Sequence, residues 1–590
     1  MSQSEEIGAL PFLGAWAATA AAYTAKALLT SATTPLLLDT DDAMRLTEVR
    51  DFLNGQNWFD LVEHRLNTPY GGLIHWSRLI DLPEAIVIGL LRLPFGAGGD
   101  LVAAYVWPLL LLGPLLWLST RLAMRLGGRE ALVPGLLLPA FSLVTLAEFA
   151  PGRFDHHSAQ ILLTLVMLWG ALDARINWRW AIAAGVAAAA GLAIGIESAP
   201  MVAATVVVFG LNWVVDPRQG TALRDFGLSF AAGTALALAQ GVPPGRWLAP
   251  MLDGISIVYA VAATLCGFAF VGLSLSPLRS WGTRLAAGCA SAVVLVAAVV
   301  VLWPSILKGP YGMLDPWLTA NWLDHISEAQ PWLTSLVADP VYPVAVAVPA
   351  VLALCFALGQ AIRNKDRQTW LIYGAVLLAM MLVTLTQIRA ARMATPIAVP
   401  GCAALIAAAW RTQSSRRGIV PALAVVGSWI ASAGVAVGVL ATLVVLAFPD
   451  YAAATDDTAR GSREACLMPE AFADLARLPP ARIMAPVDLG SHLLLFTAHS
   501  VVAAPYHRNQ EALLDAFHFF NEPIADARAI LERRGVTLVV ICPAMKEVRG
   551  LVDHAPDSFV ALYAAGRLPA WLKDESTASS PLKVYAVQPE

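Results

Sequence analysis

The stretch that organises this sequence is "DTDDAMRLTEVRD", residues 39–51, which places Asp39, Asp41 and Asp42 directly after a long apolar opening. A charged cluster that follows an apolar run of about 20 residues lies where a helix leaves the hydrocarbon of a membrane. The opening run, residues 9–29, has no basic leader and no small-residue cleavage site. We therefore expect it to be retained as a first membrane helix.

The composition of the whole chain agrees with a membrane protein. Over 590 residues, 57% are hydrophobic and 14% are charged, and the mean hydropathy is +0.63, which excludes an ordinary soluble globular chain. The net charge of -4, without a basic tail or zinc-type cysteine spacing, excludes a nucleic-acid partner. The sequence predicts a polytopic, all-α membrane domain.

Apolar runs long enough to cross the hydrocarbon recur along the first three quarters of the chain. They predict thirteen spans, at 10–31, 101–120, 131–148, 158–174, 180–196, 200–215, 226–241, 255–276, 285–303, 342–361, 369–387, 394–410 and 419–447. The loops on one side of these spans hold fifteen Arg and Lys residues, and the short loops on the other side hold five. By the positive-inside rule the amino terminus lies in the cytoplasm and everything after Phe448 lies outside.

Three segments on the predicted outer side are too long to be simple turns: 32–100, 304–341 and 449–590. Within the first, "LPEAIVIGLLRLPFG" is apolar but short, which favours a helix lying in the membrane interface. The last segment alternates strand-like runs such as "GVTLVVICP" with helical runs such as "EPIADARAILERRG". We expect residues 1–448 to form the membrane domain and 449–590 a soluble α/β domain, where Cys466 and Cys542 could pair in an oxidising compartment.

Acidic side chains recur on this predicted outer face. Asp39, Asp41 and Asp42 follow the first span, "EFAPGRFDHHS" contributes Asp155, and "WLDHISEAQP" contributes Glu328. One interpretation is a set of solvated loop ends. The other is that the carboxylates converge on a divalent cation, Mg²⁺ or Mn²⁺, which prefers such oxygen ligands and would act as a Lewis acid toward a phosphorylated leaving group.

Two arginines lie near the outer end of a predicted span. "TQIRAARMATP" contains Arg389 and Arg392. Because a charge at this depth is costly without a partner, the phosphate of a lipid fits them, and snorkelling of both side chains to the interface is the alternative.

In this order and on this face, the motifs resemble those of the GT-C membrane glycosyltransferases, and most closely the catalytic subunit of oligosaccharyltransferase. The resemblance covers nearly the whole chain. It implies Asp41 as the first acidic motif, with Arg50 nine residues later and Asp42 as the alternative position, and Asp155 as the second. "HISEAQP" resembles the family's S-V-S-E-x-Q-P loop and implies a role for Glu328 at the metal or the acceptor.

The resemblance also implies that Arg389, seven residues before Pro396, binds the diphosphate of a lipid-linked donor. Two positions depart from the family. His157 stands where the family has a second acid, which favours softer metal ions. "APVDLGSHLL" keeps Asp488 and Gly490 of the family's W-W-D-Y-G motif but lacks the tryptophan pair that helps to read an Asn-X-Ser/Thr acceptor.

We therefore expect a metal-dependent, inverting glycosyltransferase of a bacterial inner membrane that moves a sugar or oligosaccharide from a polyprenyl phosphate or diphosphate to a glycan, lipid or protein acceptor. The expected site residues are grouped by role: catalytic Asp41, Asp155 and Glu328; metal-binding Asp41, Asp155, His157 and Glu328; phosphate-binding Arg389 and Arg392; and acceptor- or sugar-binding Asp42, Asp488, and His507 and Arg508 of "AAPYHRN". The alternatives are a transferase that uses a polyprenyl-monophosphate sugar to modify an envelope glycan or lipid, and a secondary transporter with acidic ion sites. Against the transporter, the acids lie mostly in outer loops and no matched pair of broken spans is evident.

Overall fold

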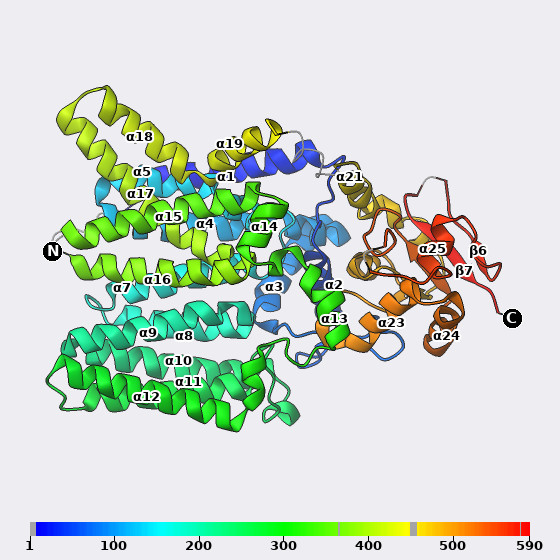
Figure 1. Ribbon diagram of the computed structural model, residues 1–590, viewed down its shortest axis with the longest axis horizontal. Coiled ribbons are helices and arrows are strands. Elements are labelled where there is room, and N and C mark those ends of the chain that lie inside the picture. The colour runs from blue at the N-terminus through cyan, green and yellow to red at the C-terminus, as the bar shows by residue number, and fades with distance from the viewer. Residues whose placement is uncertain (1–6, 364–365, 449–456, 551, 579, 590) are drawn as a thin grey trace.

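The protein is an elongated helical bundle with a smaller α/β domain at one end (Figure 1). The computed structural model describes residues 7–363, 366–448, 457–550, 552–578 and 580–589. The loops that follow the first helix and helix α12 lie between the bundle and the α/β domain.

Apolar sequence forms helices in the bundle because a helix satisfies its own backbone hydrogen bonds where no water is present. The bundle helices are α1 (Ala9–Thr30), α4 (Gly99–Gly127), α5 (Leu132–Leu137), α6 (Leu143–Glu148), α7 (His157–Asp173), α8 (Arg179–Ile194), α9 (Ala199–Val215), α10 (Gly220–Gly241), α11 (Ile257–Leu275), α12 (Trp281–Leu302), α15 (Val341–Arg363), α16 (Arg367–Thr386), α17 (Ala391–Arg416), α18 (Ile419–Ser432) and α19 (Gly434–Leu446).

Helix covers each of the thirteen predicted spans, but not all of these helices meet the requirements for crossing a membrane. Within the described residues, seven helical segments are long and apolar enough, or eight if α18 and α19, bent by 84° at their junction, form one span. The range 131–148 is broken into α5, a 3-10 turn and α6, and Pro139, which lacks the N–H group that would continue α5, lies at the start of that turn. The structure therefore shows a multi-pass bundle, and the count of thirteen stays a prediction.

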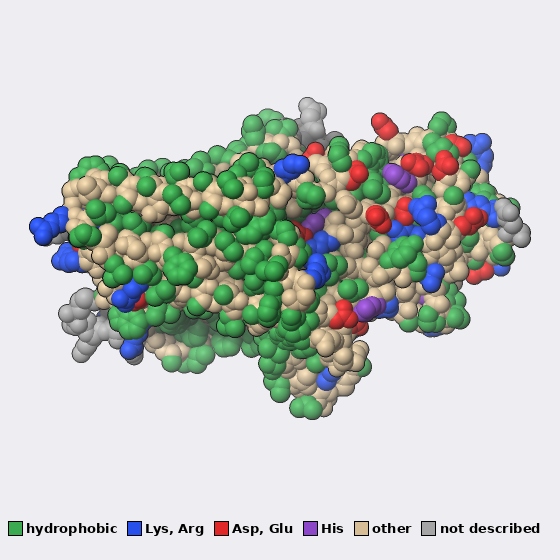
Figure 2. All heavy atoms as spheres, turned by 90° about the horizontal axis from the view of Figure 1, so that it is seen from below, with side chains coloured by type: hydrophobic (Ala, Val, Ile, Leu, Met, Phe, Trp, Pro, Cys, Tyr) green, Lys and Arg blue, Asp and Glu red, His purple; other side chains and the backbone are tan. Residues whose placement is uncertain are grey.

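Small residues let neighbouring bundle helices approach closely. A Cβ atom on Gly227 of α10 would lie 3.2 Å from the Cα atom of Gly267 on α11. Such contacts replace the hydrophobic driving force that is missing between helices in lipid. Figure 2 shows hydrophobic side chains along the length of the bundle, whereas charged side chains gather on the α/β domain and at the opposite end of the bundle.

The first outer loop folds into α2 (Thr40–Leu53), a two-stranded sheet of β1 (Val62–Glu63) and β2 (Gly72–Leu73), and α3 (Arg78–Phe95). Helix α3 packs on α2 and α4, so the apolar run predicted to be helical is a helix. Its place in the membrane interface stays a prediction. The second outer loop contains the short helices α13 (Pro316–Asn321) and α14 (Trp332–Ala338).

The carboxy-terminal domain contains a five-stranded mixed sheet, as expected for an α/β domain. The strand order is β4-β3-β5-β7-β6, with β3 parallel to β4 and β5 and with β7 antiparallel to β5 and β6. Its elements are α21 (Asp457–Cys466), β3 (Arg482–Met484), α22 (Gly490–Phe496), β4 (Ser500–Val501), α23 (Gln510–Asn521), α24 (Ile524–Arg534), β5 (Leu538–Ile541), α25 (Phe559–Ala564), β6 (Leu572–Asp574) and β7 (Lys583–Val587). The predicted domain boundary at 448/449 adjoins residues 449–456, which lie outside the described residues, so the boundary stays a prediction.

Each outer loop packs into one of two hydrophobic clusters of this domain. Side chains alternate between the faces of a strand, so Ile483 and Met484 of β3 belong to different clusters. Trp76 of the first loop joins the cluster of Ile483, and Trp322 of the second loop joins the cluster of Met484. Both loops are thereby fixed against the domain at its contact with the bundle.

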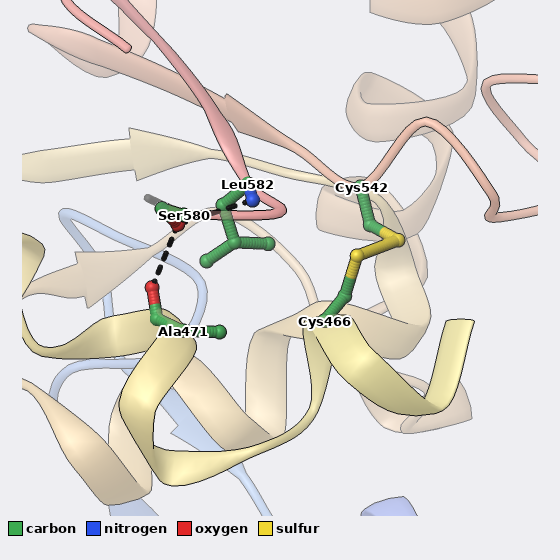
Figure 3. Close-up of a disulfide and its surroundings, with 5 residues drawn as sticks. All are labelled: Cys466, Ala471, Cys542, Ser580 and Leu582. Carbon is green, nitrogen blue, oxygen red and sulfur yellow. Dashed lines mark hydrogen bonds between the residues drawn. A yellow bond between two sulfur atoms is a disulfide. The ribbon is translucent and has the colours of Figure 1, made fainter. Parts of the chain in front are cut away.

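A disulfide joins Cys466, the last residue of α21, to Cys542, which directly follows β5 (Figure 3). The two cysteines that could pair from sequence therefore do so. The bond ties the segment that enters the domain to the middle of its sheet.

Candidate active site

A cavity of about 370 Å³ lies where the bundle, both outer loops and the carboxy-terminal domain meet. Every one of these parts contributes to its wall. The lining residues used below are Asp41, His75, Trp76, His156, His157, Glu197, Tyr311, Glu328, Arg389, Arg392, Asp488, Tyr506, His507 and Glu547.

The three acids of the opening stretch have different surroundings. Asp39 is the N-cap of α2 and accepts a hydrogen bond from the backbone N–H of Asp41 at 3.1 Å. Asp39 and Asp42 each lie 2.8 Å from Arg153, and Asp42 also accepts hydrogen bonds from the backbone N–H groups of Phe154 and Asp155. Asp42 is fully buried in these contacts, which leave it holding the 153–155 turn rather than facing the cavity.

Asp41 lines the cavity, as Asp39 also does, but Asp41 has no arginine partner among the ion pairs of the described residues. The Tyr506 hydroxyl donates a hydrogen bond to its carboxylate at 3.1 Å. Burial and the neighbouring carboxylates Asp39, Asp155 and Glu328 raise the pKa of Asp41 well above its ordinary value. A positive group at this point would relieve that repulsion.

The turn that carries Asp155 depends on Gly152. This residue has a φ of +95°, and a Cβ atom there would collide with the carbonyl of Leu36. Arg153 follows, and it pairs with Glu148 at 3.1 Å as well as with the acids of α2. The short loop between α6 and α7 is thereby clamped to the start of α2.

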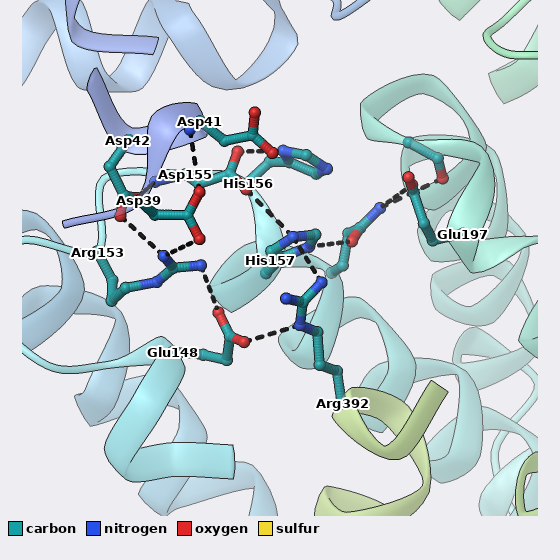
Figure 4. A network of polar contacts seen from close by, with 12 residues as sticks. Asp39, Asp41, Asp42, Glu148, Arg153, Asp155, His156, His157, Glu197 and Arg392 are labelled. Atoms are coloured by element: carbon teal, nitrogen blue, oxygen red, sulfur yellow. Dashed lines mark hydrogen bonds and ion pairs between the residues drawn. The ribbon is translucent and has the colours of Figure 1, made fainter. Parts of the chain in front are cut away.

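Asp155, His156 and His157 form a buried group (Figure 4). One carboxylate oxygen of Asp155 hydrogen-bonds His156 Nδ1, and the other lies 3.2 Å from His157 Nε2. Although burial alone raises the pKa of Asp155, the two imidazole rings and Arg45 lower it well below its ordinary value. The carboxylate is therefore ionised.

This group fits a metal ion. One ligand atom from each of the three residues lies within 4.8 Å of the others. Asp155 Oδ2 and His156 Nε2 are buried without a hydrogen-bond partner among the described residues, and buried donors or acceptors are rarely left so. A mixed carboxylate and imidazole set suits a borderline ion such as Zn²⁺.

Glu328 and the two predicted phosphate-binding arginines meet at another part of the cavity wall. Arg392 lies 2.6 Å from Glu328, 2.8 Å from Glu148 and 2.9 Å from His157 Nε2. Arg389 lies 3.9 Å from Glu328. Glu328 therefore contacts the arginines rather than Asp155. His157 connects the two parts of the wall, because it contacts both Asp155 and Arg392.

The predicted residues of the carboxy-terminal domain separate into two sets. Asp488 and His507 line the cavity. Arg508 does not line it, because its guanidinium lies on Asp253 of the α10–α11 loop, at 2.6 and 2.9 Å. This ion pair holds the domain on the bundle.

Sequence reasoning missed several residues of the cavity wall. Glu197 lies in a short loop between two predicted spans on the same predicted face as Asp155, so the reasoning that selected Asp155 also applies to it. His156 lies beside a predicted ligand. Tyr506 and Asp253 gave no signal, because their partners are hundreds of residues away in the sequence.

Comparison with solved structures identifies the fold. The oligosaccharyltransferase AglB from Archaeoglobus fulgidus, in complex with an inhibitory peptide and a dolichol-phosphate, aligns with a TM-score of 0.62 and 13% identity over 98% of this chain and 74% of AglB. Its apo form aligns with a TM-score of 0.60 and 13% identity over 90% of this chain and 69% of that one.

The structure of AglB in complex with Zn and sulfate aligns with a TM-score of 0.56 and 13% identity over 92% of this chain and 68% of that one. No protein-family model and no curated protein matches the sequence. At this level of identity the likeness concerns the fold. The chain has the fold of the archaeal oligosaccharyltransferase AglB, a GT-C membrane glycosyltransferase.

Proposed function

We propose that this protein is a membrane glycosyltransferase that moves a sugar or oligosaccharide from a polyprenyl phosphate or diphosphate to an acceptor outside the membrane. The observation that carries the proposal is the cavity whose wall brings together Asp41, Glu328, the two arginines, and His156 and His157, behind which Asp155 is buried. These residues come from four separate parts of the chain. A cation and a phosphate binding side by side would account for their convergence.

The residues divide the chemistry between them. A divalent cation held by Asp155, His156 and His157, with Asp41 nearby, would supply Lewis acidity toward the departing phosphate, and Glu328 would have to leave Arg392 to act as a further ligand. Arg389 and Arg392 bind the phosphate oxygens and neutralise the charge that grows as the sugar leaves. Because Glu328 pairs with Arg392 in this structure, donor binding exchanges one anion for another at that guanidinium.

The molecules bound in the structures of AglB support this assignment. One AglB structure is a complex with dolichol-phosphate and another is a complex with Zn and sulfate. The Cys466–Cys542 disulfide supports an oxidising, outer compartment for the carboxy-terminal domain. The arginines at the far end of the bundle support a cytoplasmic location for that end (Figure 2).

A second candidate uses the same residues with a polyprenyl-monophosphate sugar and an envelope glycan or lipid as acceptor. The missing tryptophan pair beside Asp488 favours it. The S-E-x-Q-P-like loop at Glu328 and the large outer domain favour the oligosaccharyl donor.

The test is transfer from a pool of lipid-linked sugars by the purified protein with Mn²⁺ or Mg²⁺. We expect Asp155→Asn and Glu328→Gln to lower product formation about 100-fold, the cost of losing one electrostatic contact to the transition state. Asp324→Asn, an exposed acid of the same loop as Glu328, is the matched control and keeps wild-type activity. Equal product from all four proteins contradicts the site, and ion-coupled uptake into vesicles without sugar transfer supports a transporter instead.

A further inference from the structure

A carboxylate and a histidine outside the acidic motifs form a pair across the interface between the bundle and the carboxy-terminal domain. Asp253 Oδ2 lies 2.8 Å from His507 Nε2. Arg508 donates two further hydrogen bonds to the same carboxylate. Although burial alone raises the pKa of Asp253, His507 and Arg508 lower it well below its ordinary value.

These contacts determine the tautomer of His507. An ionised carboxylate only accepts hydrogen bonds, so Nε2 of His507 carries its proton. When the ring is neutral, the lone pair is on Nδ1. Within the described part of the chain, Nδ1 of His507 has no hydrogen-bond partner, and the ring lines the cavity.

His507 lies between the two halves of the proposed site. Its neighbour Tyr506 hydrogen-bonds Asp41. On its other side, the edge of the Tyr311 ring contacts it at 5.0 Å between centroids, and Arg389 lies 5.9 Å from the centre of that same ring. A histidine in this position faces the space between the acidic group and the arginines, where acceptor and donor have to meet.

We propose that His507, oriented by Asp253, is the general base that takes the proton of a saccharide hydroxyl acceptor. The inference rests on the proposed function and specifies its acceptor. The acceptor oxygen bonds to the anomeric carbon as the bond from that carbon to the phosphate oxygen breaks. The electron pair of the broken bond leaves with the phosphate, and the hydroxyl proton moves to Nδ1 of His507.

The chemistry of the wall favours a saccharide hydroxyl over a side-chain amide. An imidazole base assists an attacking hydroxyl by accepting its proton, whereas the nitrogen of an amide has its lone pair delocalised into the carbonyl. His75 lies beside His507, at 4.9 Å between ring centroids, and lines the cavity with it, so two imidazole rings are available to contact the hydroxyl groups of a sugar. The tryptophan pair that reads an asparagine acceptor in the family is missing.

The experiment compares three acceptors with the lipid-linked sugar pool: octyl glucoside, a peptide with Ser and Thr, and a peptide with Asn-X-Thr. We expect transfer to the glucoside, lowered about 100-fold in His507→Ala and partly restored there by free imidazole. Asp253→Asn should lower kcat about tenfold without imidazole rescue. His64→Ala is the matched control, because His64 also pairs with an aspartate, Asp60, at 2.8 Å but is 68% exposed outside the cavity.

Each other result decides against the inference. If the wild type transfers sugar and His507→Ala transfers it at the same rate, His507 is not the general base and the proposed function stands. Transfer only to a peptide overturns the acceptor class. His507 has a structural role if two results occur together. Imidazole does not restore the activity lost in His507→Ala, and His507→Gln has both the same loss of activity and a lowered melting temperature. If the wild type transfers no sugar to any acceptor, the proposed function fails and this inference fails with it.

Discussion

At the scale of single residues, three clustered carboxylates have different surroundings, although Asp39 and Asp42 share Arg153 as a partner. Asp39 caps a helix, Asp42 is buried on Arg153 and two backbone N–H groups, and Asp41 faces the cavity. The difference follows from the direction in which each side chain leaves the first turn of α2. Of the two alternative positions for the first acidic motif, Asp41 therefore lines the cavity and Asp42 does not.

Tyr506 gives a test of this arrangement. Tyr506→Phe removes the hydroxyl that donates to Asp41 but keeps the ring that packs edge-on against Trp76 at 5.4 Å. The loss of one hydrogen bond to a charged group, about 1.5 kcal/mol, should lower kcat about tenfold at an unchanged KM for the donor. Initial rates of sugar transfer measure this, with Tyr563→Phe in the same domain as control, and an unchanged kcat would show that Tyr506 does not act on Asp41.

Glu547 makes the stability of the protein depend on pH. Burial and the neighbouring Asp488 raise its pKa from 4.5 to about 7. The folded state therefore holds a proton that the unfolded state releases between these values, so the contribution of Glu547 to stability is fully present below pH 4.5 and is lost as the pH rises through about 7. Glu547→Gln carries no charge, so its melting temperature should exceed that of the wild type at pH 8 and match it near pH 4.5.

The control for this measurement is Glu575→Gln, which changes an exposed acid paired with Lys573. A difference between Glu547→Gln and the wild type that is the same at both pH values would contradict the titration of Glu547.

At the scale of elements, the short loops and the helix ends carry the residues of the candidate site. The turn between α6 and α7 presents Asp155 because Gly152 allows the backbone to reverse there. Helix α2 starts at the acidic stretch, and its charged N-terminal turn suits the positive end of the helix dipole. The span predicted at 131–148 is broken because proline interrupts the hydrogen bonds of its backbone, which apolar composition alone does not reveal.

The disulfide is an element-scale constraint that can be removed. Cys466 and Cys542 are 76 residues apart. Closing a loop of this length lowers the conformational entropy of the unfolded chain and thereby stabilises the folded state by about 4 kcal/mol. Replacing both cysteines by serine should therefore lower the melting temperature of the carboxy-terminal domain. A reducing agent should lower the melting temperature of the wild type and leave that of the double variant unchanged, and equal melting of wild type and variant before reduction would contradict a stabilising bond.

At the scale of the whole molecule, the cavity exists because both outer loops are packed between the bundle and the carboxy-terminal sheet. Trp76 and Trp322 anchor the two loops in hydrophobic clusters of the domain. The Asp253–Arg508 ion pair adds a contact from the α10–α11 loop. The domain is therefore part of the site and contributes Tyr506 and His507 to its wall.

This arrangement predicts how the chain crosses the membrane. The background for the test is a protein in which the free cysteines Cys266, Cys289, Cys355 and Cys402 are replaced by alanine. Lys308→Cys then introduces a thiol in the second outer loop, and Arg218→Cys introduces one at the opposite end of the bundle. A membrane-impermeant maleimide added to cells with a permeabilised outer membrane should label Lys308→Cys and label Arg218→Cys only after lysis. The opposite pattern would place the cavity in the cytoplasm.

The sequence by itself determined the class of fold. Apolar runs predict membrane helices because the hydrocarbon leaves the backbone no other partner, and the alternating runs after residue 448 predict the α/β domain. The order of the acidic motifs was sufficient to place Asp41, Asp155, Glu328, Arg389 and Arg392 on one predicted face. In the structure, Asp41, Glu328, Arg389 and Arg392 line one cavity, with Asp155 buried behind His156 and His157, and their catalytic roles stay a prediction. These features are readable because they depend on local composition and on position along the chain.

Only the tertiary structure decided which of these groups meet. It separated Asp41 from Asp42, put Glu328 on Arg392, took Arg508 away from the cavity to Asp253, and added His156, Glu197 and Tyr506. Tyr506 and Asp41, for example, are 465 residues apart. Hydrogen-bond and ion partners at such separations are set by the packing of loops against a domain, and no periodicity or local motif of a single sequence records that packing.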